Sequence, residues 1–248
     1  MMRTTTKLAA LLLVAVAASV ATAPTASAAA CDEIVANGMG ARQPAASHGY
    51  LINSATWESD DRPADVLLSI TGGADSWNSE HTDCWHLRQN PDRVEHVTEL
   101  AGFTALRANP SMADGHNVVD FGTFGGQPAW GSACTGGGAL ACATRFRSPV
   151  RNHHIIDADI RFDVWWDWYD GRGGGNAYSA NMSQCHNQYD LWSIAAHEFG
   201  HTLGFNHASG SSQTMYFQAA GTCNISRRTL GAADVYGYRS YYAQPVSP

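Results

Sequence analysis

The sequence predicts an α+β fold, and three observations support the prediction. Strand-like segments follow one another within the range 117–162, and the last of them alternates apolar and polar residues. From residue 190 onward the apolar spacing changes to a helical period. The roughly 218 residues that follow an N-terminal leader contain no repeat or long low-complexity segment, so they can form one core. Strands followed and flanked by helices in one domain are typical of an α+β protein.

The first thirty residues have the layout of a secretory signal peptide. Two cations precede an apolar stretch at 8–21, and small residues fill 26–30. The apolar stretch has fourteen residues, about two-thirds of what a membrane-spanning helix needs. Cys31 raises the alternative of a lipoprotein anchor, but Ala28 stands where such a signal normally has leucine. We therefore expect residues 1–30 to be removed and the protein to be secreted and extracellular, with no stable membrane anchor.

The charge of the chain argues against nucleic acid as a partner. The formal net charge is −7, and loss of the leader, which carries two cations and no acid, lowers it to −9. An acidic domain lacks the basic surface that a phosphate backbone attracts. We expect no nucleic-acid partner, and we expect the protein to be a monomer.

The six cysteines all lie beyond the leader, and an even number in an exported chain predicts three disulfides. Binding of a metal by cysteine is the competing interpretation, but the chain has no C-x-x-C pair. Six cysteines allow fifteen pairings. The pairing that we expect joins Cys134 to Cys142, Cys185 to Cys223, and Cys31 to Cys84.

The folded domain is expected over 48–248, after an N-terminal lead-in at 31–47. Apolar residues at helical spacing, with proline in the first turn, predict a helix over 63–78. Gly72 and Gly73 lower the helical propensity of this segment.

Short strands are predicted from β-branched and alternating residues between glycine-rich loops. The clearest of them places Ile156, Ala158, Ile160 and Phe162 on one face and Asp157, Asp159 and Arg161 on the other. The expected strands lie at 50–52, 117–121, 141–146 and 155–162.

A second helix is predicted to begin at Asp190, which is a favourable N-cap. Its apolar stripe consists of residues four apart, and the helix is expected to end at Gly204. The stripe is formed by Leu191, Ala195, Phe199 and Leu203. A last helix is expected from about 229 to 242.

His197 and His201 project from one face of the second helix, because four residues make about one turn. A hydrolytic zinc site needs three protein ligands and one open position. His207 is the candidate third ligand, although an unbroken helix would point it away from the other two. Gly204 removes this difficulty, because glycine can adopt the left-handed conformation that ends a helix and turns the chain back.

Glu198 follows His197 directly and lies beside the metal-facing side without competing as a ligand. A carboxylate in this place suits a general base for zinc-bound water. A helix with ordinary surface histidines is the alternative, but the added glycine and third histidine make H-E-x-x-H a specific pattern. The sequence predicts one catalytic Zn²⁺ bound by His197, His201 and His207, with Glu198 as the catalytic residue.

The run His197-Glu-Phe-Gly-His-Thr-Leu-Gly-Phe-Asn-His207 resembles the extended zinc motif of the metzincin clan. Eight residues later, Thr214-Met215-Tyr216 resembles the structural Met-turn that underlies the metal in this clan, and its Met-Tyr order is most similar to the matrixins. An ordinary core methionine is the alternative for Met215, which is not expected to be a ligand.

The likeness to matrixins covers roughly residues 50–242 and is strongest from 190 onward. It implies a metzincin-like catalytic domain, in which a twisted mixed β-sheet lies above an active-site helix and a C-terminal helix. It also implies a protein or peptide substrate that binds in extended form, through backbone hydrogen bonds to an edge strand.

Three features depart from the matrixin pattern. Cys31 lacks the context of a cysteine-switch propeptide. Ala233 stands where many family members carry the first of two adjacent acids, so only Asp234 is retained. The family's structural zinc loop is not recognisable around His153 and His154, which diverge if they lie on a strand.

A calcium site is conceivable in the segment 167–176, which has oxygen ligands and a glycine-rich backbone. Its spacing matches no EF-hand, so a solvated loop is the favoured interpretation and calcium is unsupported. Trp165, Trp166 and Trp168 either line a substrate cleft or form an edge of the core.

The function predicted from the sequence is that of a secreted zinc-dependent endopeptidase, which hydrolyses internal peptide bonds with metal-activated water. Two alternatives stay open. One is an exported zinc-containing binding protein without turnover, and the other is an amidase that acts on cell-wall peptides.

Overall fold

The computed structural model describes residues 43, 47–57, 63–79, 82, 84, 97–125, 130–135, 138–151, 154–171 and 182–242. The predicted signal peptide, most of the lead-in, Cys31 with its pairing to Cys84, His153, and residues 172–176 lie outside the described residues. The predictions that concern them stay predictions.

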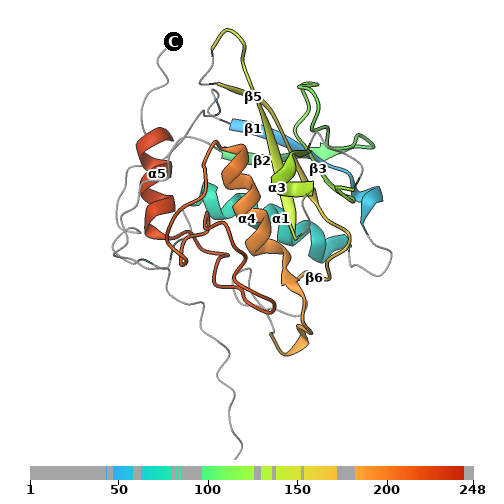
Figure 1. Ribbon diagram of the computed structural model, residues 1–248, viewed down its shortest axis with the longest axis vertical. Coiled ribbons are helices and arrows are strands. Elements are labelled where there is room, and N and C mark those ends of the chain that lie inside the picture. The colour runs from blue at the N-terminus through green and yellow to red at the C-terminus, as the bar shows by residue number, and fades with distance from the viewer. Residues whose placement is uncertain are drawn as a thin grey trace, which may run out of the picture.

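The central sheet has five strands in the order β2-β1-β3-β5-β4 (Figure 1). Its strands are β1 (Ser47–Ile52), β2 (Val97–Phe103), β3 (Val118–Phe121), β4 (Ala141–Arg147) and β5 (Ile155–Phe162). The pairs β1–β2, β1–β3 and β3–β5 are parallel, whereas β4 runs antiparallel to β5. The sheet is therefore mixed, and β4 lies at one edge with its outer side unpaired in the described sheet.

Three longer helices accompany the sheet: α1 (Pro63–Asn78), α4 (Leu191–Thr202) and α5 (Ala232–Tyr242). Helix α1 packs against α4 and β2, and α4 also packs against β4 and β5 (Figure 1). Short elements complete the fold: η1 (Ser54–Thr56), α3 (Ser132–Thr135), η3 (Met182–Gln184), and the parallel pair β6 (Trp168–Tyr169) and β7 (Tyr189–Asp190). The predicted α+β fold with a mixed sheet is confirmed.

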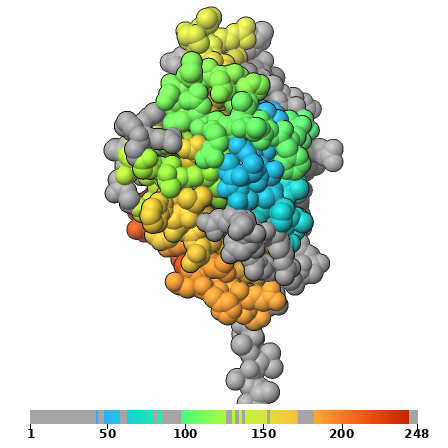
Figure 2. All heavy atoms as spheres, turned by 90° about the vertical axis from the view of Figure 1, so that its right-hand side faces the viewer, coloured from blue at the N-terminus to red at the C-terminus, as the bar shows by residue number. Residues whose placement is uncertain are grey.

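Strand β2 has no counterpart among the predicted strands. Burial alternates along the strand, but the one buried residue is the polar Thr98, whereas the apolar Val97 and Phe103 are exposed, so hydrophobicity does not reveal the inner face. The segment 97–125 spreads over one face of the molecule beside residues of β1, as the space-filling view shows (Figure 2). None of the helices in the described ranges is long and apolar enough to cross a membrane.

Gly72 and Gly73, which weaken the helical propensity of α1, allow this helix to approach α4 closely. A Cβ added at Gly72 would lie 2.4 Å from the Trp192 ring, and one at Gly73 would lie 2.5 Å from Cβ of Ala195. The loss of helical propensity is about 1 kcal/mol for each glycine. The packing of α1 on the active-site helix therefore requires the residues that lower the helical propensity of α1.

Trp77 connects the three helices in the core. Its ring stacks on Phe205 with 4.9 Å between centroids and meets Tyr238 of α5 edge-on at 5.6 Å. The indole Nε1–H donates to the carbonyl oxygen of Ala196 in α4 at 2.7 Å. Since the Trp77 side chain is fully buried, this bond also satisfies the indole N–H.

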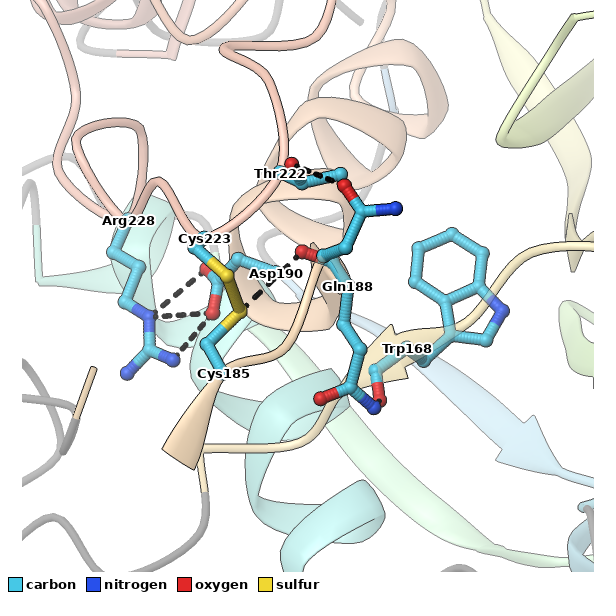
Figure 3. Close-up of a disulfide and its surroundings, with 8 residues drawn as sticks. Trp168, Cys185, Gln188, Asp190, Thr222, Cys223 and Arg228 are labelled. Carbon is cyan, nitrogen blue, oxygen red and sulfur yellow. Dashed lines mark hydrogen bonds and ion pairs between the residues drawn. A yellow bond between two sulfur atoms is a disulfide. The ribbon is translucent and has the colours of Figure 1, made fainter. Parts of the chain in front are cut away.

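Two of the predicted disulfides are present in the described residues: Cys134–Cys142 and Cys185–Cys223. The second joins the segment before α4 to the segment before α5, next to an ion pair between Asp190 and Arg228 (Figure 3). The chain around the start of α4 is thus held by a covalent bond and by a buried ion pair.

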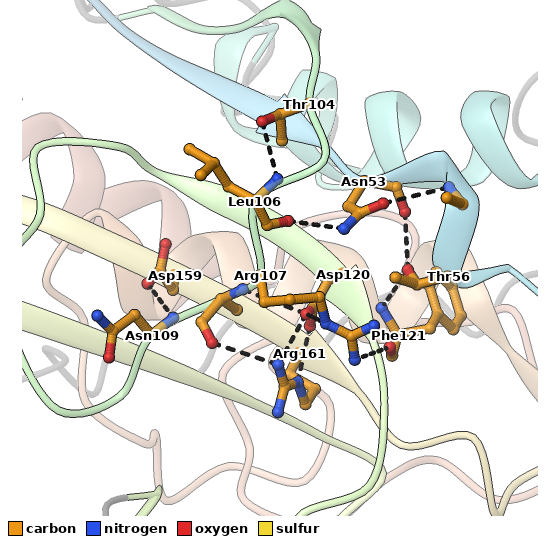
Figure 4. Close-up of polar contacts among 12 residues, drawn as sticks. Asn53, Thr56, Thr104, Leu106, Arg107, Asn109, Asp120, Phe121, Asp159 and Arg161 are labelled. Carbon is orange, nitrogen blue, oxygen red and sulfur yellow. Dashed lines mark hydrogen bonds and ion pairs between the residues drawn. The ribbon is translucent and has the colours of Figure 1, made fainter.

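The polar face of β5 is buried, and this differs from what strand alternation suggests. Asp157, Asp159 and Arg161 are at most 2% exposed, whereas Ile156 on the apolar face is 49% exposed. The loop after β2 covers the polar face. Beneath this loop, the Arg161 guanidinium donates two 2.7 Å hydrogen bonds to the Asp120 carboxylate (Figure 4).

Candidate metal centre

The active-site helix α4 begins at a well-supported N-cap. The Asp190 carboxylate accepts the Ser193 backbone N–H at 2.9 Å, as the sequence predicts for this position. The Arg228 guanidinium donates to the same carboxylate and lies 5.0 Å from the centroid of the Trp192 ring (Figure 3). Both charged side chains are almost fully buried, so loss of either one would leave an uncompensated charge in the core.

The other end of α4 has the hydrogen bonds of a Schellman motif. Gly204 has a φ of +108°, its N–H donates to the carbonyl of His201, and the N–H of Phe205 donates to the carbonyl of Gly200. The helix itself ends at Thr202. This turn returns the chain toward the helix, so that His207 lies beside His201.

The three histidines lie together, with ligand atoms within 4.8 Å of one another. The Nε2 atoms of His201 and His207 are 3.2 Å apart. Zinc at about 2.0–2.1 Å from each of two nitrogens in tetrahedral geometry requires a separation of about 3.3 Å. The donor set therefore fits a zinc ion.

Backbone carbonyls orient two of these rings. Nδ1 of His197 lies 2.7 Å from the carbonyl oxygen of Thr214, and Nδ1 of His201 lies 2.8 Å from that of Phe205. Because a carbonyl only accepts, each Nδ1 carries the proton and each Nε2 offers a lone pair. Burial lowers the pKa of His197 to about 4 and also lowers that of His207, so the neutral, metal-binding forms prevail near neutral pH.

Glu198 is 5% exposed and lines the same cleft as the histidines. Burial raises the pKa of its carboxyl to about 8, and a hydrogen bond from the backbone of Ala143 on β4 partly offsets this effect. Among the described residues, its Oε2 atom has no hydrogen-bond partner. An unpaired buried carboxyl oxygen is a place where a water molecule can be bound and can lose a proton.

Met215 is fully buried, and its side chain lies next to Gly200 of α4. A Cβ at Gly200 would lie 2.2 Å from the Met215 sulfur and 2.6 Å from the Trp77 ring. The sequence did not mark Gly200 as a site residue. Its position inside the zinc motif is a possible signal, because glycine within a helix often reflects a close contact.

Asp234 holds the turn that contains Met215. Its carboxylate accepts the N–H of Thr214 at 2.6 Å, that of Gly231 at 3.1 Å and that of Met215 at 3.4 Å. The carbonyl of Thr214 in turn orients His197. At the neighbouring position, the backbone N–H of Ala233 donates to Oε1 of Gln213 at 2.9 Å. Among the described residues, the Asp234 carboxylate thus supports the turn together with the bond from Thr214 Oγ1 to the carbonyl of Thr229.

The cleft that contains the histidines and Glu198 has a volume of about 970 Å³. One wall is β4, from Ala141 to Arg145, and the opposite wall is the segment 216–221. Arg227 supports the second wall, because it bonds to the carbonyls of Gln218 and Ser211, the latter at 3.0 Å. Arg227 has no local sequence signal, because its hydrogen bonds go to backbone carbonyls nine and sixteen residues away.

The weaker candidates lie elsewhere. None of the three tryptophans at 165–168 lines the cleft: Trp168 is buried, Trp166 packs on Tyr189, and Trp165 is 80% exposed. Within the described residues, the three histidines form the only cluster of three or more His, Cys, Asp or Glu side chains suited to a metal ion. The described part of the segment 167–176 thus adds no support for calcium.

Comparison with known proteins agrees with this geometry. Residues 130–243 match the family model described as matrixin. The chain is matrixin-like. It is 36% identical over 95 residues to interstitial collagenase of Bos taurus and 30% identical over 92 residues to stromelysin-1 of Mus musculus. Each alignment covers 37% of this matrixin-like chain, but only 17% and 16% of the two relatives, so the chain spans a small part of their length.

Proposed function

We propose that this matrixin-like chain is a secreted zinc-dependent endopeptidase, with His197, His201 and His207 as zinc ligands and Glu198 as the general base. One observation carries the proposal. The three histidines, whose ligand atoms lie within 4.8 Å of one another, line one cleft with β4 and with Glu198, whose Oε2 has no hydrogen-bond partner among the described residues. The matrixin family, whose members are zinc metalloendopeptidases, supports the same function.

A zinc ion bound by the three histidines would polarise the scissile carbonyl and lower the pKa of a bound water. Glu198 is placed to hold a water molecule at Oε2, to accept a proton from it and to deliver a proton to the nitrogen of the leaving amine. His197 and His201 keep their orientation during the reaction, because the carbonyls of Thr214 and Phe205 hold their Nδ1 atoms.

The substrate is a protein or peptide that binds in extended form. The outer edge of β4 offers backbone N–H and C=O groups along one wall of the cleft, and an extended peptide can add to them as a further strand. Neither nucleic acid nor a second copy of the chain has a part in this proposal.

Export of the protein is part of the proposal. It is supported by the signal-peptide layout of residues 1–30 and by the two disulfides among the described residues, since disulfides persist in oxidising compartments. The proposal does not assign a means of latency, because Cys31 lacks the context of a cysteine switch.

Glu198→Ala tests the assignment of the general base. We expect the variant to retain one zinc per chain and to lose activity on an unfolded protein substrate by at least about 100-fold, the usual contribution of general-base catalysis. Glu99→Ala is the matched control, because it removes the same charge from an exposed position on β2.

The proposal is contradicted if wild type and Glu198→Ala both retain zinc but neither cleaves any peptide in a broad library. This would favour a zinc-containing binding protein without turnover. Cleavage confined to cell-wall peptides would favour the amidase alternative.

A further inference from the structure

Arg145 connects the edge strand to the end of the active-site helix. On β4 it has the same parity as Ala141 and Ala143, which pack against the main core that includes α4. Its Nη1 donates to the carbonyl oxygens of His201 and Phe205, each at 3.1 Å, and its Nη2 donates to Oδ1 of Asn206 at 2.8 Å. One guanidinium group therefore donates to three acceptors in the segment between the candidate ligands His201 and His207.

The three acceptors belong to the parts of the chain that fix the ligands. The carbonyl of Phe205 also holds Nδ1 of His201 at 2.8 Å, so one oxygen accepts from both the ligand ring and Arg145. The carbonyl of His201 lies at the C-terminal end of α4, where cations are favoured by the helix dipole. Asn206 directly precedes His207.

We propose that Arg145 is a positioning residue for the metal centre, which clamps the turn 203–207 so that His201 and His207 are correctly spaced before zinc binds. This inference rests on the zinc site of the proposed function. The planar guanidinium suits the task, because its donors form a rigid fork that loses little conformational freedom for each bond. The side chains that orient metal ligands commonly change metal affinity 10–100-fold when they are mutated.

The charge of Arg145 acts in the opposite direction from the clamp. A cation near a Zn²⁺ site repels the metal, so its removal would strengthen zinc binding if charge alone mattered. Loss of the clamp removes one donor from each of the three acceptors and loosens the turn that carries His207, which weakens zinc binding. The sign of the change in zinc affinity therefore separates the two effects.

Zinc affinity and zinc release measured by competition with a chromophoric chelator test the clamp. We expect Arg145→Ala to weaken zinc binding 10–100-fold and to release zinc faster than wild type. Arg147→Ala, which removes the same charge from an exposed position on the same strand, should stay within about twofold of wild type, as expected for a surface charge screened by solvent. Unchanged or tighter zinc binding by Arg145→Ala, or an equal loss in Arg147→Ala, would overturn the proposal.

Arg145→Lys keeps the test decisive if the alanine variant does not fold. Lysine retains the charge but lacks the fork, so its zinc affinity should fall between those of wild type and Arg145→Ala. A lysine variant that folds without metal, as judged by near-ultraviolet circular dichroism, and binds zinc as tightly as wild type contradicts the clamp.

The zinc measurements need no peptide substrate, so they separate this inference from the proposed activity. A wild-type chain that binds zinc through an Arg145-dependent turn but cleaves no peptide supports the clamp and contradicts the endopeptidase. A wild-type chain that binds no zinc contradicts both.

Discussion

Gly200→Ala should destabilise the chain although it replaces glycine with the best helix former. The new Cβ would lie 2.2 Å from the Met215 sulfur and 2.6 Å from the Trp77 ring, well inside the 3.5–4.0 Å of a favourable contact. Both neighbours are fully buried, so neither can move without disturbing the core. Overpacking costs about 1–3 kcal/mol, and alanine returns about 1 kcal/mol of helix propensity. Because this overlap is severe, we expect a net loss of about 2 kcal/mol.

Urea unfolding of the metal-free protein with linear extrapolation measures this loss. Gly125→Ala is the control, because Gly125 is exposed and no atom lies within 4 Å of an added Cβ. Met215→Ala provides a second test. Met215→Ala removes the sulfur and so relieves the overlap. Its destabilising effect should therefore be about 1 kcal/mol smaller in the Gly200→Ala background than in wild type. Equal or greater stability of Gly200→Ala relative to wild type would refute this reasoning.

Two further outcomes test the turn and the buried acids. Gly204→Ala places an L-residue at a φ of +108° and should lower the free energy of unfolding in urea titrations by at least about 1–2 kcal/mol. Gly204→Asn should lower it less, because asparagine tolerates the left-handed conformation better. An alanine variant as stable as wild type contradicts this prediction. Burial raises the pKa of Asp159 to about 7, against about 3.9 unfolded, so its stabilising contribution is full below about pH 4 and is lost as pH rises through about 7. The free energy of unfolding of wild type should therefore fall more between about pH 5 and about pH 8 than that of Asp159→Asn, and identical pH dependence would count against this sign.

The ends of the active-site helix were predictable because their signals are local. The Asp190 carboxylate bonds to an N–H three residues away, and Gly204 acts through its own φ. The separation of His197 and His201 is likewise fixed by helix geometry. The return of His207 needed only one left-handed residue between the second and third histidines. The 18 residues from Asp190 to His207 thus contain most of the information for the candidate ligands.

The supporting contacts were not predictable, because they join segments far apart in the sequence. The burial of Asp159 depends on a loop that covers it, and backbone N–H groups of Asn109 and Val118 bond to its carboxylate. In the sequence, Arg145 is one of several residues of a predicted strand and has no distinguishing pattern. Only the folded structure places its side chain at the end of α4. Burial alternates along strand β2, but Val97 and Phe103 are exposed and Thr98 is the buried position, so hydrophobicity does not mark its inner face.

The carboxylate under the Met-turn has a consequence for the order in which the site is completed during synthesis. Asp234 follows His207 by 27 residues, and it bonds to Thr214, whose carbonyl orients His197. Because chains are made from the N-terminus, a nascent chain can present all three histidines before Asp234 has been added. A segment made after all three candidate ligands therefore supplies the support for the first of them.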